Sequence, residues 1–350
     1  MAKRYKRHRD YGFFDQDIRL SKLSELGDPL ERLNKGVDFE MFRDLLETSL
    51  HKDSKGNGGR PPYDYVLMFK ILILQRYYNL SDHQTEYQIN DRMSFMRFLN
   101  LTISDDIPDS KTIWNFGEQL TDLGLVKELF DLFGKELSRL GLIINEGKIV
   151  DASFVEAPRQ RNSREDNKKI KSGNGSDLWK DKPNKARQKD IDARWTKKNF
   201  QNYYGYKNHA KVDAKSKLID SYQVSDASVH DSQTLDDLLQ EQDKEQELYA
   251  DSAYVGQETT LSKHRVKDQI HQKGYKNKPL TEQQKSLNTE KSKTRARVEH
   301  VFGFMENSMN SMFFRKVGIK RAETAVGLMN LVYNMFRKIQ LTNQNVGTCA

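Results

Sequence analysis

The sequence predicts an α/β protein in which an all-helical N-terminal region precedes a mixed central sheet with flanking helices. Three observations support this class. Apolar residues recur at helical spacing through residues 38–140. From Leu142 onward the apolar stretches become short, which is typical of strands bounded by turns. Val, Phe, Met and Leu then return at helical spacing over residues 296–339.

The helical region begins where Asp38 can cap a helix that contains Phe39, Phe42 and Leu46. The segment KDSKGNGGRPP over residues 52–62 is a turn-rich break, and residues 63–79 form a densely apolar helix. A further helix starts with Lys111 after a cap at Asp109 or Ser110 and is broken at Gly124. Short helices with capped starts are compatible with a helix-turn-helix that reads DNA, although most such helix pairs only pack against each other in a core. If the region reads DNA, we expect the helix from Ser110, with Lys111, to enter a groove.

The second half alternates strands and helices. Strands are expected at 142–150, 203–213, 218–224, 247–250 and 267–272, with helices at 233–240, 296–309 and 323–339. Residues 158–200 are polar and basic and are expected to form an inserted loop. The predicted organisation is a basic arm and lead-in over 1–37, a helical domain over 38–140, a catalytic domain over 142–342 that contains the basic insertion 158–200, and a tail over 343–350.

Charge is unevenly placed along this chain of 350 residues, whose net charge is +8. Lys and Arg outnumber Asp and Glu by 5 to 1 over residues 1–10, by 14 to 6 over 158–200 and by 10 to 3 over 261–295. Three basic segments on an acidic remainder indicate a polyanionic partner such as DNA, although a solvated surface with a basic arm would have the same composition.

The composition excludes several classes of protein. Cys349 is the only cysteine, so an internal disulfide framework and a Cys-based zinc site are both ruled out. The charged start MAKRYKRHRD has no apolar stretch after it, so we expect no secretory signal. The apolar runs are far shorter than a membrane span, and no membrane partner is expected.

Two expected strands each end on an aspartate, Asp151 and Asp251. Ligand sites in open α/β sheets lie beyond the carboxyl ends of strands, so adjacent strands would bring these carboxylates together. A hard cation such as Mg²⁺ would remove their repulsion. Glu299 is the third candidate, since it lies beside the apolar face of an expected helix and could point inward. Taken singly, a strand-end Asp is usually a turn or cap residue and a helical Glu is usually solvent-exposed, so the catalytic interpretation depends on the joint arrangement of the three.

At these residues the chain resembles the DDE transposases of bacterial insertion sequences, specifically the insertion-sequence-five family. The similar segments are Asp151–Glu156 with Arg159–Asn162, Trp195–Lys198 with Tyr204–His209, Tyr249–Tyr254, and Arg295 four residues before Glu299. Asp38–Leu120 is similar to the helical domain of that family. Two positions depart from its Glu motif: Ser292 stands where Tyr is common, and Glu306 where Lys is common. A phosphate contact made by that Lys would fall here to Arg295, Arg297 or Lys293.

The resemblance implies an RNase H-like fold and catalysis by Asp151, Asp251 and Glu299 with two Mg²⁺ or Mn²⁺ ions. It implies recognition of terminal inverted repeats, hydrolysis that frees a 3′-OH, and joining of that 3′-OH to target DNA. It also implies a homodimer or higher multimer on DNA and a cytoplasmic, nucleoid-associated protein. An RNase H-like nuclease that cuts without joining, and a catalytically inactive DNA-binding remnant, are the alternative functions.

Other residues are candidates for DNA contact. Lys207 and Lys211 alternate along one strand face with His209 between them, and this face could contact DNA or be solvated. Trp195 could stack on a flipped base, but an anchoring role inside the insertion is the favoured interpretation.

Overall fold

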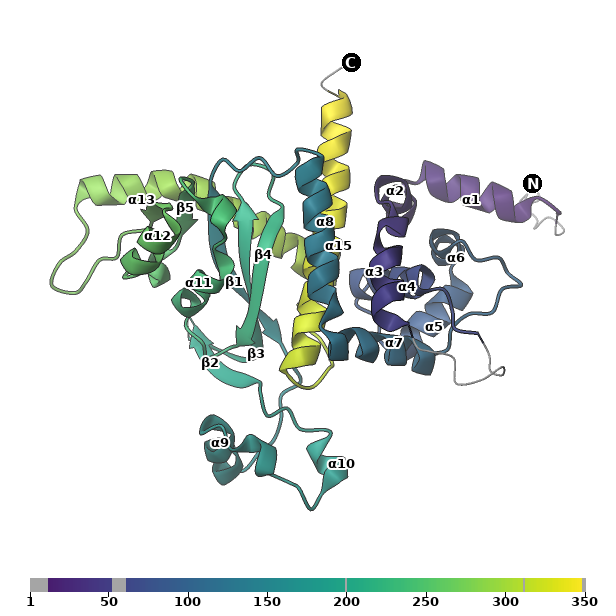
Figure 1. Cartoon of the computed structure of the whole chain (residues 1–350), viewed down its shortest axis with the longest axis horizontal. Coiled ribbons are helices and arrows are strands. Elements are labelled where there is room, and N and C mark those ends of the chain that lie inside the picture. Colours follow the sequence, from purple (N-terminus) through teal and green to yellow (C-terminus); the bar gives the residue numbers. More distant parts are fainter. Residues whose placement is uncertain (1–11, 52–60, 199, 311, 348–350) are drawn as a thin grey trace, which may run out of the picture.

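The structure is a computed structural model that describes residues 12–51, 61–198, 200–310 and 312–347. Helices occupy the first part of the chain, strands and short helices alternate in the middle, and helices return at the end (Figure 1). The basic residues 1–10, which begin the arm and lead-in predicted over 1–37, and Cys349 lie outside the described residues. Within the described part of the chain, no helix is both long and apolar enough to cross a lipid bilayer.

The N-terminal region is helical, as predicted, but it starts earlier than residue 38. Helix α2 lies in the segment predicted as a lead-in, where Asp28 caps it and Pro29 occupies its first turn. Leu30 and Leu33 of α2 are fully buried, which makes this helix part of the core. The elements are α1 (Asp15–Glu25), α2 (Pro29–Gly36), η1 (Phe39–Phe42), α3 (Arg43–Leu50), α4 (Tyr65–Tyr77), α5 (Asp82–Asp91), α6 (Met93–Leu99), α7 (Ser110–Leu123) and α8 (Leu125–Arg139).

The sheet is mixed, which agrees with the predicted fold class. Its strands are β1 (Lys148–Glu156), β2 (Arg194–Lys198), β3 (Gln201–Asp213), β4 (Ile219–Asp226), β5 (Glu247–Ala250) and β6 (Lys267–Ile270). The path β2-β3-β1-β5-β6 has β1 antiparallel to β3 and parallel to β5, and β4 also pairs with β3. Strands β1, β2 and β4 therefore all run antiparallel to β3, whereas β1, β5 and β6 run parallel to one another.

Each face of the sheet has its own apolar core. On one face, Ile149 and Tyr206 belong to the large core that the helices share. On the other, Val150, Leu248 and Ala250 pack with residues of α11 (Leu235–Leu238) and α12 (Glu258–His264). Ile149 and Val150 are successive residues of β1 and point to opposite faces. Because both faces of the sheet are covered, the alternation of apolar and polar residues along these strands does not distinguish buried from exposed side chains.

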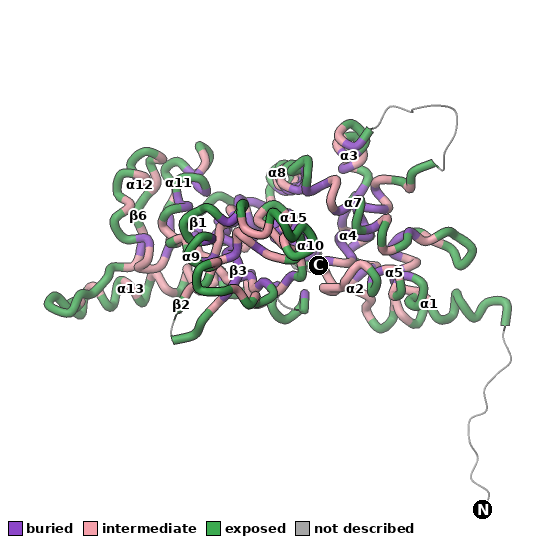
Figure 2. Tube along the Cα trace, turned by 90° about the horizontal axis from the view of Figure 1, so that it is seen from below, coloured by how far each residue is buried: buried purple, intermediate pink, exposed green. Residues whose placement is uncertain are grey.

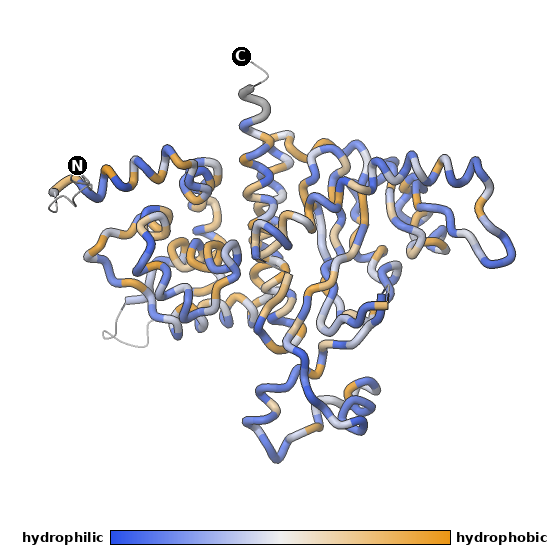
Figure 3. The backbone as a smooth tube through the Cα atoms, turned by 180° about the vertical axis from the view of Figure 1, so that it is seen from behind, coloured by the Kyte–Doolittle hydropathy of each residue, from blue (hydrophilic) through white to orange (hydrophobic). Residues whose placement is uncertain are grey.

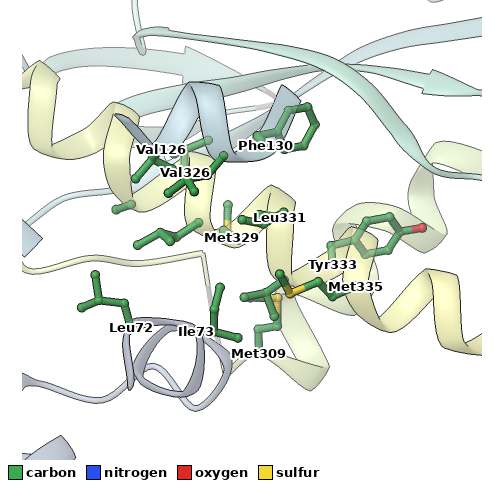
Figure 4. Close-up of a cluster of buried hydrophobic side chains, with 14 of the residues drawn as sticks. Leu72, Ile73, Val126, Phe130, Met309, Val326, Met329, Leu331, Tyr333 and Met335 are labelled. Carbon is green, nitrogen blue, oxygen red and sulfur yellow. The ribbon is translucent and has the colours of Figure 1, made fainter. Parts of the chain in front are cut away.

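Helix α15 (Ile319–Gly347) joins the two halves of the molecule. It contacts α8 and β4 as well as α2, α4 and α7, and it runs between the sheet and the helical region (Figure 1). Apolar side chains of α4, α8 and α15 converge in one cluster (Figure 4). The change from helices to strands near residue 141 follows the prediction, but the hydrophobic core continues across it. The segment predicted as a tail from residue 343 overlaps the end of α15, which continues to Gly347.

Residues 158–200 are not the loop that their polarity predicted. They contain α9 (Arg164–Lys171), η2 (Gly175–Asp177), α10 (Pro183–Ala186) and β2, and the helices of this insertion stand away from the sheet (Figure 1). Ser163 and Asp166 form a capping box that starts α9. Ile170 is buried and supplies this small unit with an apolar contact. Reciprocal capping and one apolar anchor thus order a segment whose mean composition indicates a loop.

The end of the sheet leads into α13 (Glu282–Arg295), η6 (Ala296–Val298), α14 (Glu299–Gly303) and the π-helical turn η7 (Phe304–Ser308). Helix α13, which the sequence analysis did not predict, has no buried residue. Figures 2 and 3 show it as a largely exposed, hydrophilic helix at one end of the molecule. The remaining short elements are η3 (Asp231–Thr234), η4 (Glu241–Asp243) and η5 (Ser252–Tyr254).

Gly205→Ala is expected to lower the free energy of unfolding, because β3 passes close to β1 at this residue. Gly205 has φ +145°, and an added Cβ would lie 2.4 Å from the Val155 carbonyl oxygen and 2.8 Å from the Ala157 nitrogen. Both atoms belong to the backbone, so relief requires the strands to separate. Overpacking of this kind costs about 1–3 kcal/mol, which urea denaturation would measure.

Gly134→Ala is the matched control for that substitution. Gly134 lies inside α8, and an added Cβ would have no neighbour within 4 Å. Alanine in a helix interior is better than glycine by up to about 1 kcal/mol. Equal effects of the two substitutions would contradict the close approach of β3 to β1.

Candidate active site at the end of the parallel strands

Asp151 is the fourth residue of β1 rather than its last, because β1 continues to Glu156. The expected strand end is therefore wrong for the β3 side, where antiparallel pairing runs from Lys148 to Glu156. On the β5 side the parallel pairing stops at Ile149. The sheet thus opens on one side of β1 just before Asp151, and its side chain keeps 16% of its surface exposed.

Asp251 follows β5 directly, as predicted, and caps η5 by accepting a hydrogen bond from the Ala253 nitrogen at 2.8 Å. The register pairs Ile149 with Tyr249, so Asp151 and Asp251 follow at equivalent positions of neighbouring parallel strands. Neighbouring strands lie about 4.8 Å apart. The strand geometry therefore brings these two predicted residues together.

Electrostatics agree with this juxtaposition. Burial raises the pKa of Asp151 to about 6; the Ala152 N–H and Arg295 oppose the rise, and the charge of Asp251 adds to it. One carboxylate thus makes the ionised form of the other costly, and added positive charge would stabilise the pair.

Arg295, the last residue of α13, supplies positive charge at this place. Its Nη1 donates to Asp151 Oδ2 at 3.0 Å, and its Nη2 lies 3.7 Å from Glu299 Oε1. One guanidinium therefore contacts two of the three predicted acidic residues. We call Asp151, Asp251, Arg295 and Glu299 the carboxylate site.

Glu299 does not point inward as the sequence analysis expected. It is the first residue of α14, and 68% of its side chain is exposed. The apolar contacts of this segment are made by the neighbouring Val298 and Val301, which are fully buried. Among the described residues no group of three or more His, Cys, Asp or Glu side chains is placed to hold a metal ion. Asp151 and Asp251 fit a cation by their proximity, whereas Glu299 reaches the site through Arg295.

Three residues predicted to contact DNA are buried in β3 instead. Lys207 donates to Asp231 at 2.7 Å, and Lys211 pairs with Asp220 at 3.1 Å and with Asp243. His209 is bonded to Ser225 at 2.8 Å, and burial lowers its pKa to about 4, so it is neutral at pH 7. The alternation along β3 is real, but both faces of the strand are covered, so neither DNA contact nor a solvated face fits these side chains.

The other predicted contact residues have different environments. Arg297 donates to the Ala214 carbonyl oxygen at 2.7 Å, which ties η6 to the β3–β4 turn. Lys293 is exposed on α13, and Lys111 is exposed in the first turn of α7. Trp195 is 46% exposed on β2, where its ring packs near Tyr204 and the Arg159 guanidinium. Lys293, Lys111 and Trp195 therefore remain accessible.

Two residues near the carboxylate site, His271 and Tyr254, were not predicted from the sequence. His271 follows β6, its ring nitrogen lies 3.3 Å from Ser292 Oγ, and the charges of Arg295 and Asp251 both act on it. The Tyr254 hydroxyl is buried without a hydrogen-bond partner among the described residues, and the charges of Asp151 and Asp251 act on it. Asp251 was selected because ligand sites lie beyond the carboxyl ends of strands. The same argument could have selected His271, because the parallel strand β6 ends just before it.

Comparisons with known proteins identify the family of the chain. The family model described as "Transposase domain (DUF772)" matches residues 18–119, and the model described as "Transposase DDE domain" matches residues 145–335. A cryo-EM structure of the piggyBac transposase synaptic complex with hairpin DNA is similar at a TM-score of 0.47 and 13% identity, over 93% of this chain and 77% of that chain. That likeness is too weak to support an inference. The DDE model spans more than half of the chain, which therefore belongs to the transposase DDE domain family.

Proposed function

We propose that this chain is the transposase of an insertion sequence, which binds the terminal inverted repeats, cleaves the DNA there and joins the freed 3′-OH to target DNA. One observation carries the proposal: Asp151 and Asp251 occupy equivalent positions on neighbouring parallel strands of a chain in the transposase DDE domain family. Its affiliation with the insertion-sequence-five family within that group stays a prediction from the motifs.

Asp151, Asp251 and Glu299 would hold two divalent cations, Mg²⁺ or Mn²⁺. When bound, such ions activate an attacking oxygen and stabilise the leaving oxygen of a phosphodiester. Support for this role comes from Asp151, whose pKa burial raises to about 6, with a further rise from the charge of Asp251, so that a cation bound between the two carboxylates would stabilise their ionised forms. Glu299 is the proposed third ligand, and its Oε1 lies 3.7 Å from Nη2 of Arg295, the same guanidinium that contacts Asp151.

Positive side chains beside the acidic residues would orient the DNA. Arg295 lies against Asp151, and Lys293 is exposed one half-turn earlier on α13. Arg297 is engaged with the Ala214 carbonyl, so we assign phosphate contact to Arg295 and Lys293. Phosphate contacts fix the register of DNA and make its affinity depend on salt.

The route of the DNA follows from the charge of each region. The insertion 158–200 is basic and carries the accessible Trp195. The described helical residues 12–51 and 61–140, in contrast, hold 13 Lys and Arg against 21 Asp and Glu. We therefore propose that most phosphate contacts lie on the sheet domain and its insertion, and that the helical region reads DNA through few residues such as Lys111. A dimer or higher multimer would hold the two element ends together.

A strand-transfer assay tests this function. A duplex with the terminal repeat that flanks the gene, precleaved to expose its 3′-OH, is mixed with plasmid target and Mg²⁺. We expect joined product, no product in EDTA, and partial or full replacement of Mg²⁺ by Mn²⁺. Cleavage of an uncut end without any joining of the precleaved end would identify a nuclease instead. The absence of both reactions, with binding retained, would identify an inactive remnant.

A further inference from the structure

A cavity of about 320 Å³ lies beside the carboxylate site and has no role in the function proposed above. Its wall is built by the segments that follow β5 and β6, by α12, and by the first turn of α13. These elements lie together at the far end of the sheet from α15 (Figure 1). Ligand sites in open α/β sheets occupy this place, beyond the carboxyl ends of parallel strands.

The cavity and the carboxylate site share one edge of the sheet. Val255, which lines the cavity, follows Asp251 by four residues, with η5 between them. His271 also lines the cavity, and the charges of Asp251 and Arg295 both act on it. A DNA strand whose phosphodiester lay at Asp151 and Asp251 would therefore pass close to this cavity.

Hydrogen bonds from α13 hold the wall in place. Asn288 accepts from the Gln272 nitrogen and donates to the Gln272 carbonyl oxygen, both at 2.9 Å. Lys291 Nζ donates to the Ile270 carbonyl oxygen at 3.0 Å. Tyr275 and Lys278 close a tight turn through two backbone hydrogen bonds of 3.0 Å. The cavity is thus preformed rather than a gap between loose loops, which is the usual condition of a ligand site.

The lining has the chemistry of a nucleotide site. Leu261, Ile270 and Leu280 are apolar, the Tyr275 ring is 60% exposed, and Gln257, Gln272 and Gln284 supply amide groups. Two lysines, Lys273 and Lys278, are balanced by Glu258 and Asp268. Because the lining has equal numbers of positive and negative side chains, it does not favour a bare phosphate inside the cavity. It favours a neutral, planar, hydrogen-bonding group inside, with its phosphates at the exposed lysines.

We propose that this cavity receives one unpaired nucleotide of the DNA bound at the carboxylate site, its base stacked against Tyr275 and hydrogen-bonded by the glutamine amides. This inference rests on the proposed function and adds to it a nucleotide subsite. Extruded bases are held in this way, by stacking on aromatic or apolar side chains and by hydrogen bonds to the base edge. The nucleotide comes either from the transposon end or from the target strand.

Fluorescence of 2-aminopurine, which rises when the base leaves the stack, tests the inference. The base analogue is placed in turn at each position around the reacting bond, in one series of transposon-end duplexes and one of target duplexes. Binding to the full-length protein is recorded without added divalent metal, so that a signal requires no cleavage. We expect a rise at one position in one series, which identifies the source of the nucleotide.

Variants decide whether the base enters this cavity. Val255→Trp, which fills the cavity from its exposed rim, is expected to abolish the rise. Tyr275→Ala is expected to weaken occupancy about tenfold, the order of magnitude of base stacking on an aromatic ring. Leu287→Ala removes an exposed apolar side chain of α13 that does not line the cavity, and it is expected to leave the signal unchanged.

Failure of the nucleotide subsite can be distinguished from failure of the proposed transposase reaction. Absence of a rise in both series, or a rise that survives both Val255→Trp and Tyr275→Ala, overturns the nucleotide subsite. Cleavage and joining of the same duplexes in Mg²⁺ are scored separately with the wild-type protein. A rise that responds to the variants without any cleavage or joining would retain the subsite and reject the proposed reaction.

Discussion

Asp251→Asn is expected to abolish DNA cleavage and joining while leaving binding to the transposon end intact. Asparagine keeps the shape of the side chain but removes the negative charge that would hold a divalent cation beside Asp151. We expect the rate to fall by at least about a thousandfold, which corresponds to about 4 kcal/mol in the activation barrier. The measurement is single-turnover cleavage of a labelled transposon end in Mg²⁺, with binding followed by gel shift.

The substitution is expected to spare the fold. Asp251 accepts one hydrogen bond from the Ala253 nitrogen, and the amide oxygen of asparagine can accept the same bond. Loss of its charge also removes the repulsion that helps to raise the pKa of Asp151. Asp226→Asn is the matched control, because Asp226 ends β4 and accepts from the Ser228 nitrogen at 2.8 Å, outside the carboxylate site. Cleavage by Asp251→Asn at the rate of Asp226→Asn would refute the assignment.

Lys211→Met is expected to cause the largest loss of stability. Lys211 lies in a buried ion cluster with Lys148, Asp213, Asp220 and Asp243, which links β1, β3 and β4 to η4. Burial alone would raise the pKa of Asp220, but Lys211 and Lys148 outweigh it and hold that pKa below its ordinary value. Removing Lys211 leaves three buried carboxylates with one lysine. Breaking a buried ion pair costs about 3–5 kcal/mol, to be measured by urea denaturation.

A control and a compensating change sharpen this test. Lys215→Met removes a lysine that is half exposed and lies 3.4 Å from Glu146, and exposed pairs of this kind contribute about 0–1 kcal/mol. The double variant Lys211→Met, Asp243→Asn removes one charge of each sign and is expected to recover part of the loss. A loss for Lys211→Met no larger than that for Lys215→Met would show that the cluster does not stabilise the fold.

Burial of polar side chains beside partners that are distant in the sequence explains a failed prediction. Lys207, His209 and Lys211 occur in a strand with polar alternation, which normally indicates a solvated face. The partners that make their burial possible, Asp231, Ser225 and Asp243, lie 16 to 32 residues away in the sequence. Local spacing carries no signal for such pairs. Only the packing of η3 and η4 against the sheet decides that these side chains face inward.

Only part of the carboxylate site was predictable, because only part of it depends on local sequence. Asp251 directly follows a short apolar strand, and the motifs around Asp151 and Asp251 are long, so local sequence located both residues. The direction of Glu299 depends on how η6 and α14 meet the sheet, where Val298 and Val301 take the buried positions. The contact of Arg295 with Asp151 spans 144 residues and could not be read from spacing.

The sequence by itself determined the family and the order of a helical first part, a strand-rich middle and a helical end, because caps, turn residues, apolar periodicity and contiguous motifs are local properties. It placed the cap of α7 at Asp109 or Ser110, of which Asp109 is the cap, the end of that helix at Gly124, and β5 immediately before Asp251. Tertiary structure alone decided which charged side chains are buried, how far β1 extends, where Glu299 points and that a cavity adjoins Asp251. These features depend on contacts between segments distant in the chain, and the free energy of burying a charge depends on the partners those contacts supply.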